Sequence, residues 1–200
     1  TIDMSGSYRD YGYNDAQSGW NSYLLPVIES EVRKIGPRNS FELGCGNGSV
    51  ANWLGTMGYS ILGVDLSESG IEMAKRQAAN NDRVRFDVAS VYDDLAARFG
   101  QFDLLISLEV VEHLYAPRDY AKRAFELLSP GGFLLLSTPY HGYWKNLALC
   151  VSGKMDAHFT ALWDGGHIKF WSIPTITSLL EGAGFEIKRI HRVGRVPTFA

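Results

Sequence analysis

The chain has few of the features that suit a protein to a membrane or to nucleic acid. Its longest apolar runs, around Leu104–Leu108 and Phe133–Leu136, have the length of strands, whereas a membrane-spanning helix needs about 18 apolar residues. No basic block is present, and 19 Lys and Arg against 22 Asp and Glu leave a net charge of −3. We therefore expect no membrane insertion and no nucleic-acid partner.

Cysteines and targeting signals are equally scarce. Cys45 and Cys150 are the only cysteines and lie far apart, which predicts reduced thiols rather than a disulfide framework. The start, TIDMSGSYRDYG, lacks the charged-then-apolar pattern of a signal peptide, so we expect a cytoplasmic protein. No repeat, low-complexity tract or linker divides the 200 residues, and we expect a single domain.

What the chain does contain is an alternation of short apolar runs and helical patterns from Phe41 onward. Because a parallel crossover needs the length of a helix, this order predicts an α/β fold: a doubly wound, mostly parallel Rossmann-like sheet with helices on both faces. We expect strands at Ser40–Leu43, Ser60–Val64, Val84–Val88, Phe102–Leu108, Gly132–Ser137 and Phe185–His191. Helices are expected at Asp15–Ile35 (in two pieces broken near Pro26), Ser49–Met57, Glu68–Ala79, Asp94–Arg98, Pro117–Leu128 and Ile173–Glu181.

The stretch FELGCGNGSV at positions 41–50 places three glycines directly after the first expected strand and before the first expected crossover helix. Amides at a helix N-terminus are unpaired, and a turn without Cβ atoms lets a ligand lie against the backbone. The pattern therefore predicts a ligand site at the carboxyl edge of the sheet. A glycine turn needed only for tight strand-to-helix packing would have the same sequence.

The second expected strand ends in Asp65, about 20 residues past Gly44, where an acid meets the two hydroxyls of a ribose. Asp65 would also serve as a cap for the helix that begins near Ser67. The spacing G-C-G-N-G differs from the G-x-G-x-x-G of dinucleotide enzymes, which makes NAD the second choice of ligand.

Four segments, FELGCGNG, GVDLSESGIEMA, FDLLISLEVVEHL and LLSPGGFLLLSTP, resemble in order and spacing the motifs of class I S-adenosylmethionine-dependent methyltransferases. Within that superfamily the chain is most similar to small UbiG-like enzymes, the O-methyltransferases of ubiquinone biosynthesis. The resemblance runs from about Phe41 to Phe185 and implies S-adenosylmethionine as cofactor. It also implies an antiparallel partner for the Phe185–His191 strand, which the sequence up to Ala200 does not contain, so that either the given chain is truncated or that strand is absent.

The resemblance assigns the cofactor contacts residue by residue. Gly44, Cys45, Gly46 and Gly48 would line the methionine part, Asp65 would hold the ribose, Leu66 would lie along the adenine, and Leu108 would contact the cofactor from beneath. The acid that many relatives place after the third strand is missing from Ala89-Ser90-Val91, so Ser90 is expected to take its contact with the adenine amine.

The stretch LEVVEHL places Glu109, Glu112 and His113 just past the fourth expected strand. In the ubiquinone enzymes this pattern resembles a divalent-cation site near the acceptor, and carboxylates with an imidazole can hold such an ion. Two alternatives are that Glu112 and His113 act directly as acid or base, or that they begin a helix and form only local hydrogen bonds.

Residues 139–171 form a long connection that is dense in aromatic and histidine side chains. Connections of this length are usually functional, and we expect this one to cover the pocket of a small-molecule methyl acceptor, with a short helix around Trp144–Val151. His141 and His167 are its candidate catalytic bases. Large aromatics also fill protein cores, and a lone histidine is often structural. We call residues 139–171 the insertion.

Four parts of the single domain are therefore expected: a helical cap (1–38), a cofactor-binding core (39–138), the insertion (139–171), and a C-terminal helix and strand (172–200). Tyr8, Tyr11, Tyr13 and Trp20 of the cap either close over the cofactor or form the face of a surface helix. The expected activity is methyl transfer from S-adenosylmethionine to an aromatic or quinol-like hydroxyl. The alternatives are a module that binds this cofactor without turnover and an NAD-dependent oxidoreductase.

Overall fold

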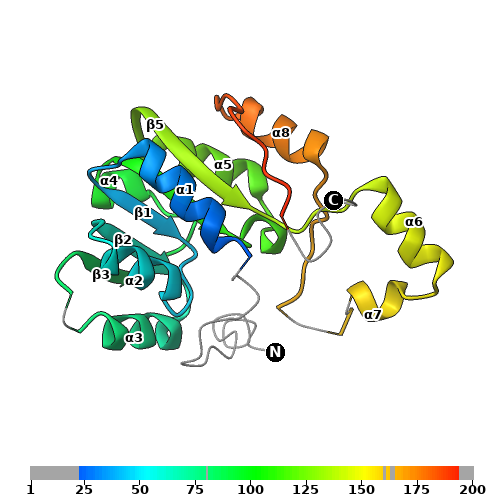
Figure 1. Cartoon of the computed structure of the whole chain (residues 1–200), viewed down its shortest axis with the longest axis horizontal. Helices are drawn as coiled ribbons and strands as arrows, with labels where there is room; N and C mark the ends of the chain where they lie inside the picture. Colours follow the sequence, from blue (N-terminus) through cyan, green and yellow to red (C-terminus); the bar gives the residue numbers. More distant parts are fainter. Residues whose placement is uncertain (1–22, 80, 160, 163–164, 194–200) are drawn as a thin grey trace, which may run out of the picture.

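A computed structural model describes residues 23–79, 81–159, 161–162 and 165–193. Its centre is a five-stranded, all-parallel sheet with the order β3-β2-β1-β4-β5 (Figure 1). The predicted α/β fold is therefore confirmed. Chain order reverses beside β1, which lies between β2 and β4, and such a reversal is where open α/β sheets bind ligands. The strands are β1 (Ser40–Leu43), β2 (Ile61–Asp65), β3 (Val84–Val88), β4 (Phe102–Leu108) and β5 (Leu128–Ser137).

Nearly every side chain of the central strands is buried, and this burial stabilises the strands. Phe41 and Leu43 of β1 enter one hydrophobic core, whereas Leu104 and Ile106 of β4 enter the core on the opposite face of the sheet. This two-residue alternation places apolar side chains on both faces, as a parallel sheet covered on both sides requires.

Helices cover the two faces in separate groups. Residues of α1, α2 and α3 line one core, and residues of α4, α5 and α8 line or pack against the other. The helices are α1 (Leu25–Ile35), α2 (Ser49–Thr56), α3 (Glu68–Gln77), α4 (Leu95–Phe99), α5 (Pro117–Glu126), α6 (Tyr143–Val151), α7 (Met155–Phe159) and α8 (Ile173–Gly182).

The helix boundaries follow local chemistry. Pro26 lies in the first turn of α1, so the second of the two expected helical pieces begins beside it, because a first-turn proline has no backbone hydrogen bond to lose. The earlier piece of the expected helix, residues 15–22, lies outside the described residues. At α8 the Ser172 hydroxyl accepts the Thr175 amide at 3.4 Å while the Thr175 hydroxyl accepts the Ser172 amide at 2.9 Å, a reciprocal cap.

The expected strand Phe185–His191 is wrong for the residues that the structure describes. This segment has no strand assignment, and β5 forms one edge of the sheet. Side chains hold the segment instead: Arg189 and His191 reach the buried Glu31 of α1 at 2.7 and 3.4 Å. A strand needs a ladder of backbone hydrogen bonds with a neighbour, and an alternating sequence alone does not supply one.

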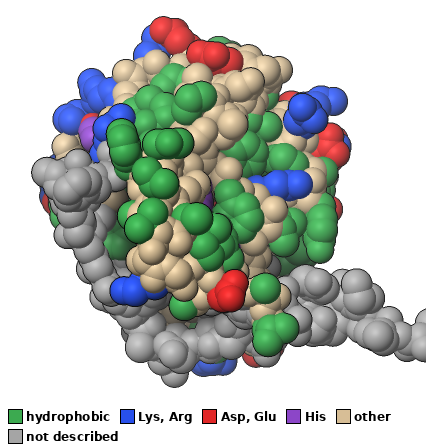
Figure 2. All heavy atoms as spheres, turned by 90° about the vertical axis from the view of Figure 1, so that its right-hand side faces the viewer, with side chains coloured by type: hydrophobic (Ala, Val, Ile, Leu, Met, Phe, Trp, Pro, Cys, Tyr) green, Lys and Arg blue, Asp and Glu red, His purple; other side chains and the backbone are tan. Residues whose placement is uncertain are grey.

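The insertion extends away from the sheet at the carboxyl edge (Figure 1). Neither α6 nor α7 has a buried residue, and hydrophobic side chains gather on the face that these helices form (Figure 2). Tyr140 and Trp171 close the base of the insertion through an isolated parallel bridge. Within the described residues, no helix has the length and apolar character needed to cross a membrane. Cys45 and Cys150 are free thiols, as predicted.

Candidate functional site

The glycine turn connects β1 to α2 in a conformation that suits glycine. Gly44, Gly46 and Gly48 have φ angles of 79°, 54° and 74°, in the left-handed region that side chains with a Cβ rarely adopt. The amides of Gly44 and Cys45 donate to the Val64 carbonyl of β2 at 2.8 and 2.9 Å. The turn is therefore fixed against the neighbouring strand, at the carboxyl edge of the sheet.

Packing limits side chains at two of the three glycines. A Cβ on Gly48 would lie 2.5 Å from the Ala74 Cβ and 2.6 Å from the Phe86 ring, both in the core beneath α2, and a Cβ on Gly44 would lie 2.4 Å from Val110 Cγ2. Gly48 is therefore required by packing as well as by its backbone angle, and Gly44 is crowded by the Val110 side chain. This is the role that the packing interpretation of the glycine turn expected.

Substitution of Gly48 by alanine is expected to lower the free energy of unfolding by about 3 kcal/mol, from left-handed strain together with overpacking. Gly58→Ala is the matched control, because Gly58 has a φ of 93° and nothing within 4 Å of an added Cβ. Urea denaturation of both variants measures the difference. Equal losses would show that contact with Ala74 and Phe86 contributes nothing.

Asp65, the last residue of β2, connects two loops at this edge. Its carboxylate accepts the Gly46 amide at 2.8 Å and the Ser67 amide at 2.8 Å. Burial raises the pKa of Asp65, and these amides lower it. Each carboxylate oxygen has two lone pairs, so the group keeps acceptor capacity for further hydroxyls. The predicted helix cap is instead formed by Ser67, whose hydroxyl accepts the Gly70 amide at 3.0 Å.

The other expected cofactor residues lie along the same edge. Leu66 follows Asp65 and is 43% exposed, an unusual position for a leucine that packs against no core. Ser90 accepts the Tyr92 amide at 3.2 Å through its hydroxyl, and Asp87 pairs with Arg98 at 2.7 Å. Leu108 ends β4, partly buried. Leu66 is thus an exposed apolar surface next to Asp65.

A buried acid lies under the glycine turn. Glu42 of β1 is 3% exposed, and its Oε2 has no hydrogen-bond partner. Burial, with a smaller contribution from Asp65, raises the pKa of Glu42 to about 8, while the Ala51 amide lowers it. Glu42 is therefore protonated at neutral pH in the folded chain. Our sequence analysis missed it, although an acid inside an otherwise apolar strand was a visible signal.

Glu42 is expected to make the protein less stable as pH rises. Its folded pKa of about 8 exceeds the ordinary value of 4.5, so between these values the unfolded chain binds fewer protons than the folded chain, and unfolding becomes easier with pH. Glu42→Gln should therefore raise the free energy of unfolding at pH 8 by a few kcal/mol and flatten its dependence on pH. Urea denaturation at pH 5 to 8 measures both. An unchanged slope would contradict the assignment.

The turn after β4 contains a strained residue. Glu109 has a φ of 55°, the only positive φ of a non-glycine residue in the described chain. Ser137, at the end of β5, holds it: the Glu109 amide donates to the Ser137 carbonyl at 3.1 Å, and the Ser137 hydroxyl donates to Glu109 Oε1 at 2.7 Å. Such strain persists only where surrounding contacts impose it and is common at functional sites.

Glu112, His113 and His167 form a compact cluster at the same edge. Each offers one ligand atom, and the three atoms lie within 4.8 Å of one another. Glu112 Oε1 is buried, has no hydrogen-bond partner and lies 4.0 Å from His167 Nε2. Thr138 donates to the other oxygen, Oε2, at 3.1 Å. The structure thus brings together three of the four residues expected to be catalytic.

Burial favours the neutral forms of the three groups in this cluster. Burial, together with the Glu109 charge, raises the pKa of Glu112 to about 8. Burial lowers the pKa of His113 and, with repulsion from His113, brings the pKa of His167 to about 4. Glu109, expected among the metal ligands, is hydrogen-bonded to Ser137 and lies outside the cluster. The third member of the cluster is His167 instead.

His141, the fourth residue expected to be catalytic, lies elsewhere. It is 8% exposed, and its ring contacts His158, Phe159 and Phe170 of the insertion. The expected cap residues Tyr8, Tyr11, Tyr13 and Trp20 lie outside the described residues. Thr138 and Ser137 were missed by the sequence analysis, although polar residues at the carboxyl end of a strand are the usual signal.

Parallel order, the switch point beside β1 and the glycine turn define a Rossmann-like fold with a cofactor site at the carboxyl edge of the sheet. The sequence model of a family described as a methyltransferase domain matches residues 23–190. The chain belongs to this family, within the class I S-adenosylmethionine-dependent methyltransferases. The alternative of an NAD-dependent oxidoreductase is thereby set aside.

Two relatives are ubiquinone biosynthesis O-methyltransferases. The protein of Thiobacillus denitrificans is 31% identical over 171 residues, covering 85% of this chain and 73% of that protein. The protein of Dinoroseobacter shibae is 32% identical over 149 residues, covering 72% and 58%. The chain spans about half the length of most of the first curated relatives that it matches.

Solved structures support the fold. The methyltransferase domain of bacterial CtHen1 superposes with a TM-score of 0.67 at 23% identity, covering 88% of this chain and 92% of that one. Magnesium protoporphyrin IX methyltransferase of Synechocystis PCC 6803, solved with bound S-adenosylhomocysteine, gives a TM-score of 0.67 at 19% identity, covering 86% and 76%.

Proposed function

We propose that the chain transfers the methyl group of S-adenosylmethionine to a hydroxyl of a small aromatic acceptor, beside a divalent cation held by Glu112, His113 and His167. The observation that carries the proposal is this cluster, which lies at the same sheet edge as the glycine turn. The names of the curated relatives support oxygen as the atom methylated.

The residues at the edge fit the cofactor. Gly44 and Gly46 offer a turn without side chains, Asp65 offers acceptor capacity to the ribose, and Leu66 offers an exposed apolar surface to the adenine. The cofactor supplies the methyl group on a sulfonium. The chain must hold the acceptor oxygen in line with the bond that breaks, at about 3 Å, so most of its contribution is positioning.

The residues of the cluster also fit a divalent cation. Glu112 presents a buried oxygen without a partner, and His113 Nδ1 lies 3.2 Å from the Gly166 carbonyl. A proton on Nδ1 would bind that carbonyl and leave the Nε2 lone pair for an ion, as is usual for metal-binding histidines. A bound cation lowers the pKa of a hydroxyl that approaches it. Thr138 fixes the orientation of the Glu112 carboxylate.

Methylation of 4-methylcatechol tests the proposal. The protein, S-adenosylmethionine and Mg²⁺ or Mn²⁺ should give one equivalent of S-adenosylhomocysteine and a monomethyl ether, both measured by mass spectrometry. A phenol with one hydroxyl, 4-methylphenol, should react far more slowly, because one oxygen cannot chelate the cation. Calorimetric binding of S-adenosylmethionine without turnover of any diol would instead support a binding module.

A further inference from the structure

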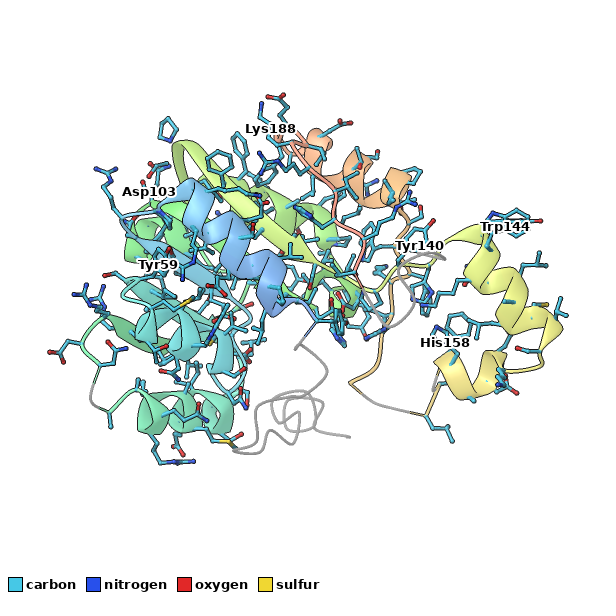
Figure 3. The ribbon with its side chains drawn as sticks, viewed as in Figure 1. Tyr59, Asp103, Tyr140, Trp144, His158 and Lys188 are labelled. Atoms are coloured by element: carbon cyan, nitrogen blue, oxygen red, sulfur yellow. The ribbon has the colours of Figure 1, made fainter. Side chains whose placement is uncertain are left out.

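Three basic side chains lie near one another in the insertion: His141, Lys145 of α6 and His158 of α7. The rings of His141 and His158 lie 5.6 Å apart, and half-buried Lys145 donates to the Tyr140 carbonyl at 3.0 Å. In Figure 3, His158 lies on the side of α7 toward the sheet, whereas Trp144 is directed outward. We call these three residues the basic cluster.

No acidic side chain among the described residues compensates the basic cluster. Burial, Lys145 and His158 lower the pKa of His141 to about 4, and burial and Lys145 lower that of His158. Burial alone lowers the pKa of Lys145. No carboxylate raises any of these three pKa values. The three groups are therefore gathered partly out of water, and Lys145 is the cation among them without a counter-charge, because His141 with a pKa of about 4 is neutral at pH 7.

Two buried polar groups of the same region face each other without a full hydrogen bond. His141 Nδ1 and Asn146 Oδ1 are both shielded from solvent, and neither meets the geometry of a hydrogen bond, although the Asn146 side chain raises the pKa of His141 as a weak acceptor. Buried polar atoms are nearly always well paired in folded proteins, so a polar ligand beside the three basic groups would complete these hydrogen bonds. The Asn146 amide can present its nitrogen at the same position after rotation.

Aromatic rings lie beside the basic cluster. The Phe159 and Phe170 rings lie 4.9 Å apart, edge to face, and His141 stacks 5.9 Å from Phe159. Such rings favour a flat apolar ligand. The cluster of Glu112, His113 and His167 is connected to these rings along the chain, because His167 lies three residues before Phe170. The charges of His158 and Lys145 also lower the pKa of His167.

We propose that the basic cluster binds an oxyanion, carboxylate or phosphate, carried by the aromatic ring of the methyl acceptor, while the hydroxyl to be methylated faces Glu112, His113 and His167. The proposal rests on the proposed function and names its substrate class. His141, Lys145 and the Asn146 amide supply donors, and the rings of Phe159 and Phe170 contact the acceptor ring. Hydrogen bonds to an anion from charged donors are among the strongest in proteins.

Calorimetry on the protein loaded with S-adenosylhomocysteine tests the proposal without turnover. Benzoate and phenyl phosphate are titrated against benzamide, a neutral molecule of the same shape. At least one anion should bind about tenfold or more tightly than benzamide, and the tighter of the two identifies the oxyanion. Lys145→Met and His158→Gln should remove most of this preference. Lys145→Arg should keep part of it.

Lys154→Met is the matched control, because Lys154 lies exposed on the same insertion and should leave the preference intact. Equal binding of anions and benzamide would overturn the proposal. So would weakened binding of S-adenosylhomocysteine in Lys145→Met, since the basic cluster would then serve the cofactor carboxylate.

Kinetics separate this proposal from the proposed function. The wild type should methylate 3,4-dihydroxybenzoate with a kcat/KM about tenfold or more above that for 4-methylcatechol, and the ratio should fall toward one in Lys145→Met. Turnover of both diols with a ratio of one in the wild type would contradict the oxyanion site alone. Turnover of neither, with anion binding intact, would contradict the proposed function alone.

Discussion

Alanine at position 65 is expected to weaken binding of S-adenosylmethionine and S-adenosylhomocysteine by about a hundredfold or more. Two hydrogen bonds from ribose hydroxyls to a carboxylate contribute about 1.5–3 kcal/mol each, and every 1.4 kcal/mol is tenfold in affinity. The same carboxylate holds the Gly46 amide, so its loss would also release the glycine turn. Calorimetric titration with both sulfur cofactors measures the effect.

The matched control for this prediction is Asp87→Asn. Asp87 lies near the end of the neighbouring strand β3 but pairs with Arg98, and its substitution should change cofactor affinity less than twofold. Asp65→Asn keeps the shape of the side chain but replaces one of the two accepting oxygens by an NH2 donor, so it tests the loss of charge together with the loss of one acceptor. Urea denaturation of each variant distinguishes lost binding from lost folding. Wild-type affinity in a folded Asp65→Ala protein would remove the ribose assignment.

Glu112→Gln is expected to lower kcat/KM for 4-methylcatechol by about a hundredfold or more, since a cation that activates the hydroxyl contributes several kcal/mol. Affinity for S-adenosylhomocysteine should stay within about twofold, because binding at the glycine turn does not use this carboxylate. Mn²⁺ titration by calorimetry should show one site in the wild type and a much weaker one in Glu112→Gln and His167→Gln.

Glu181→Gln, on α8, is the control for the metal prediction, because Glu181 is exposed and lies outside the cluster. Dialysis against EDTA should remove activity from the wild type, and Mg²⁺ or Mn²⁺ should restore it. Full activity after EDTA, with no Mn²⁺ binding, would leave Glu112 as a candidate acid or base and would contradict the metal site.

The fold was predictable because each of its strands is encoded by a short local pattern in the sequence. Strands β1, β3 and β4 have the predicted bounds, since each is a short apolar run between turn or helix signals. The strand expected at Phe185–His191 failed because pairing depends on a neighbour, not on alternation. Its side chains found Glu31 on α1, a partner far away in sequence.

The residue types of the site were predictable from the sequence. Which of these residues lie close together was less predictable. His167 was expected to act from the insertion, yet its proximity to Glu112 depends on the path of the insertion, which no sequence period encodes. The strained φ of Glu109 turns its carboxylate toward Ser137, away from the ligand set that the sequence pattern predicts. The sequence does not distinguish a glycine needed for packing, such as Gly48 beside Phe86, from a glycine needed for contact with a ligand, because both positions select the same residue.

The two ends of the insertion lie side by side, so the insertion can be exchanged as a unit. Its ends meet at Tyr140 and Trp171, where the His141 amide donates to the Trp171 carbonyl at 2.8 Å. The Glu112 carbonyl accepts the Ile168 and Lys169 amides at 2.9 Å each. A loop with adjoining ends can change length at little entropic cost, so the insertion can change without rebuilding the sheet. His167 lies inside this exchangeable part, and under the proposed function a replacement would have to bring its own histidine to Glu112.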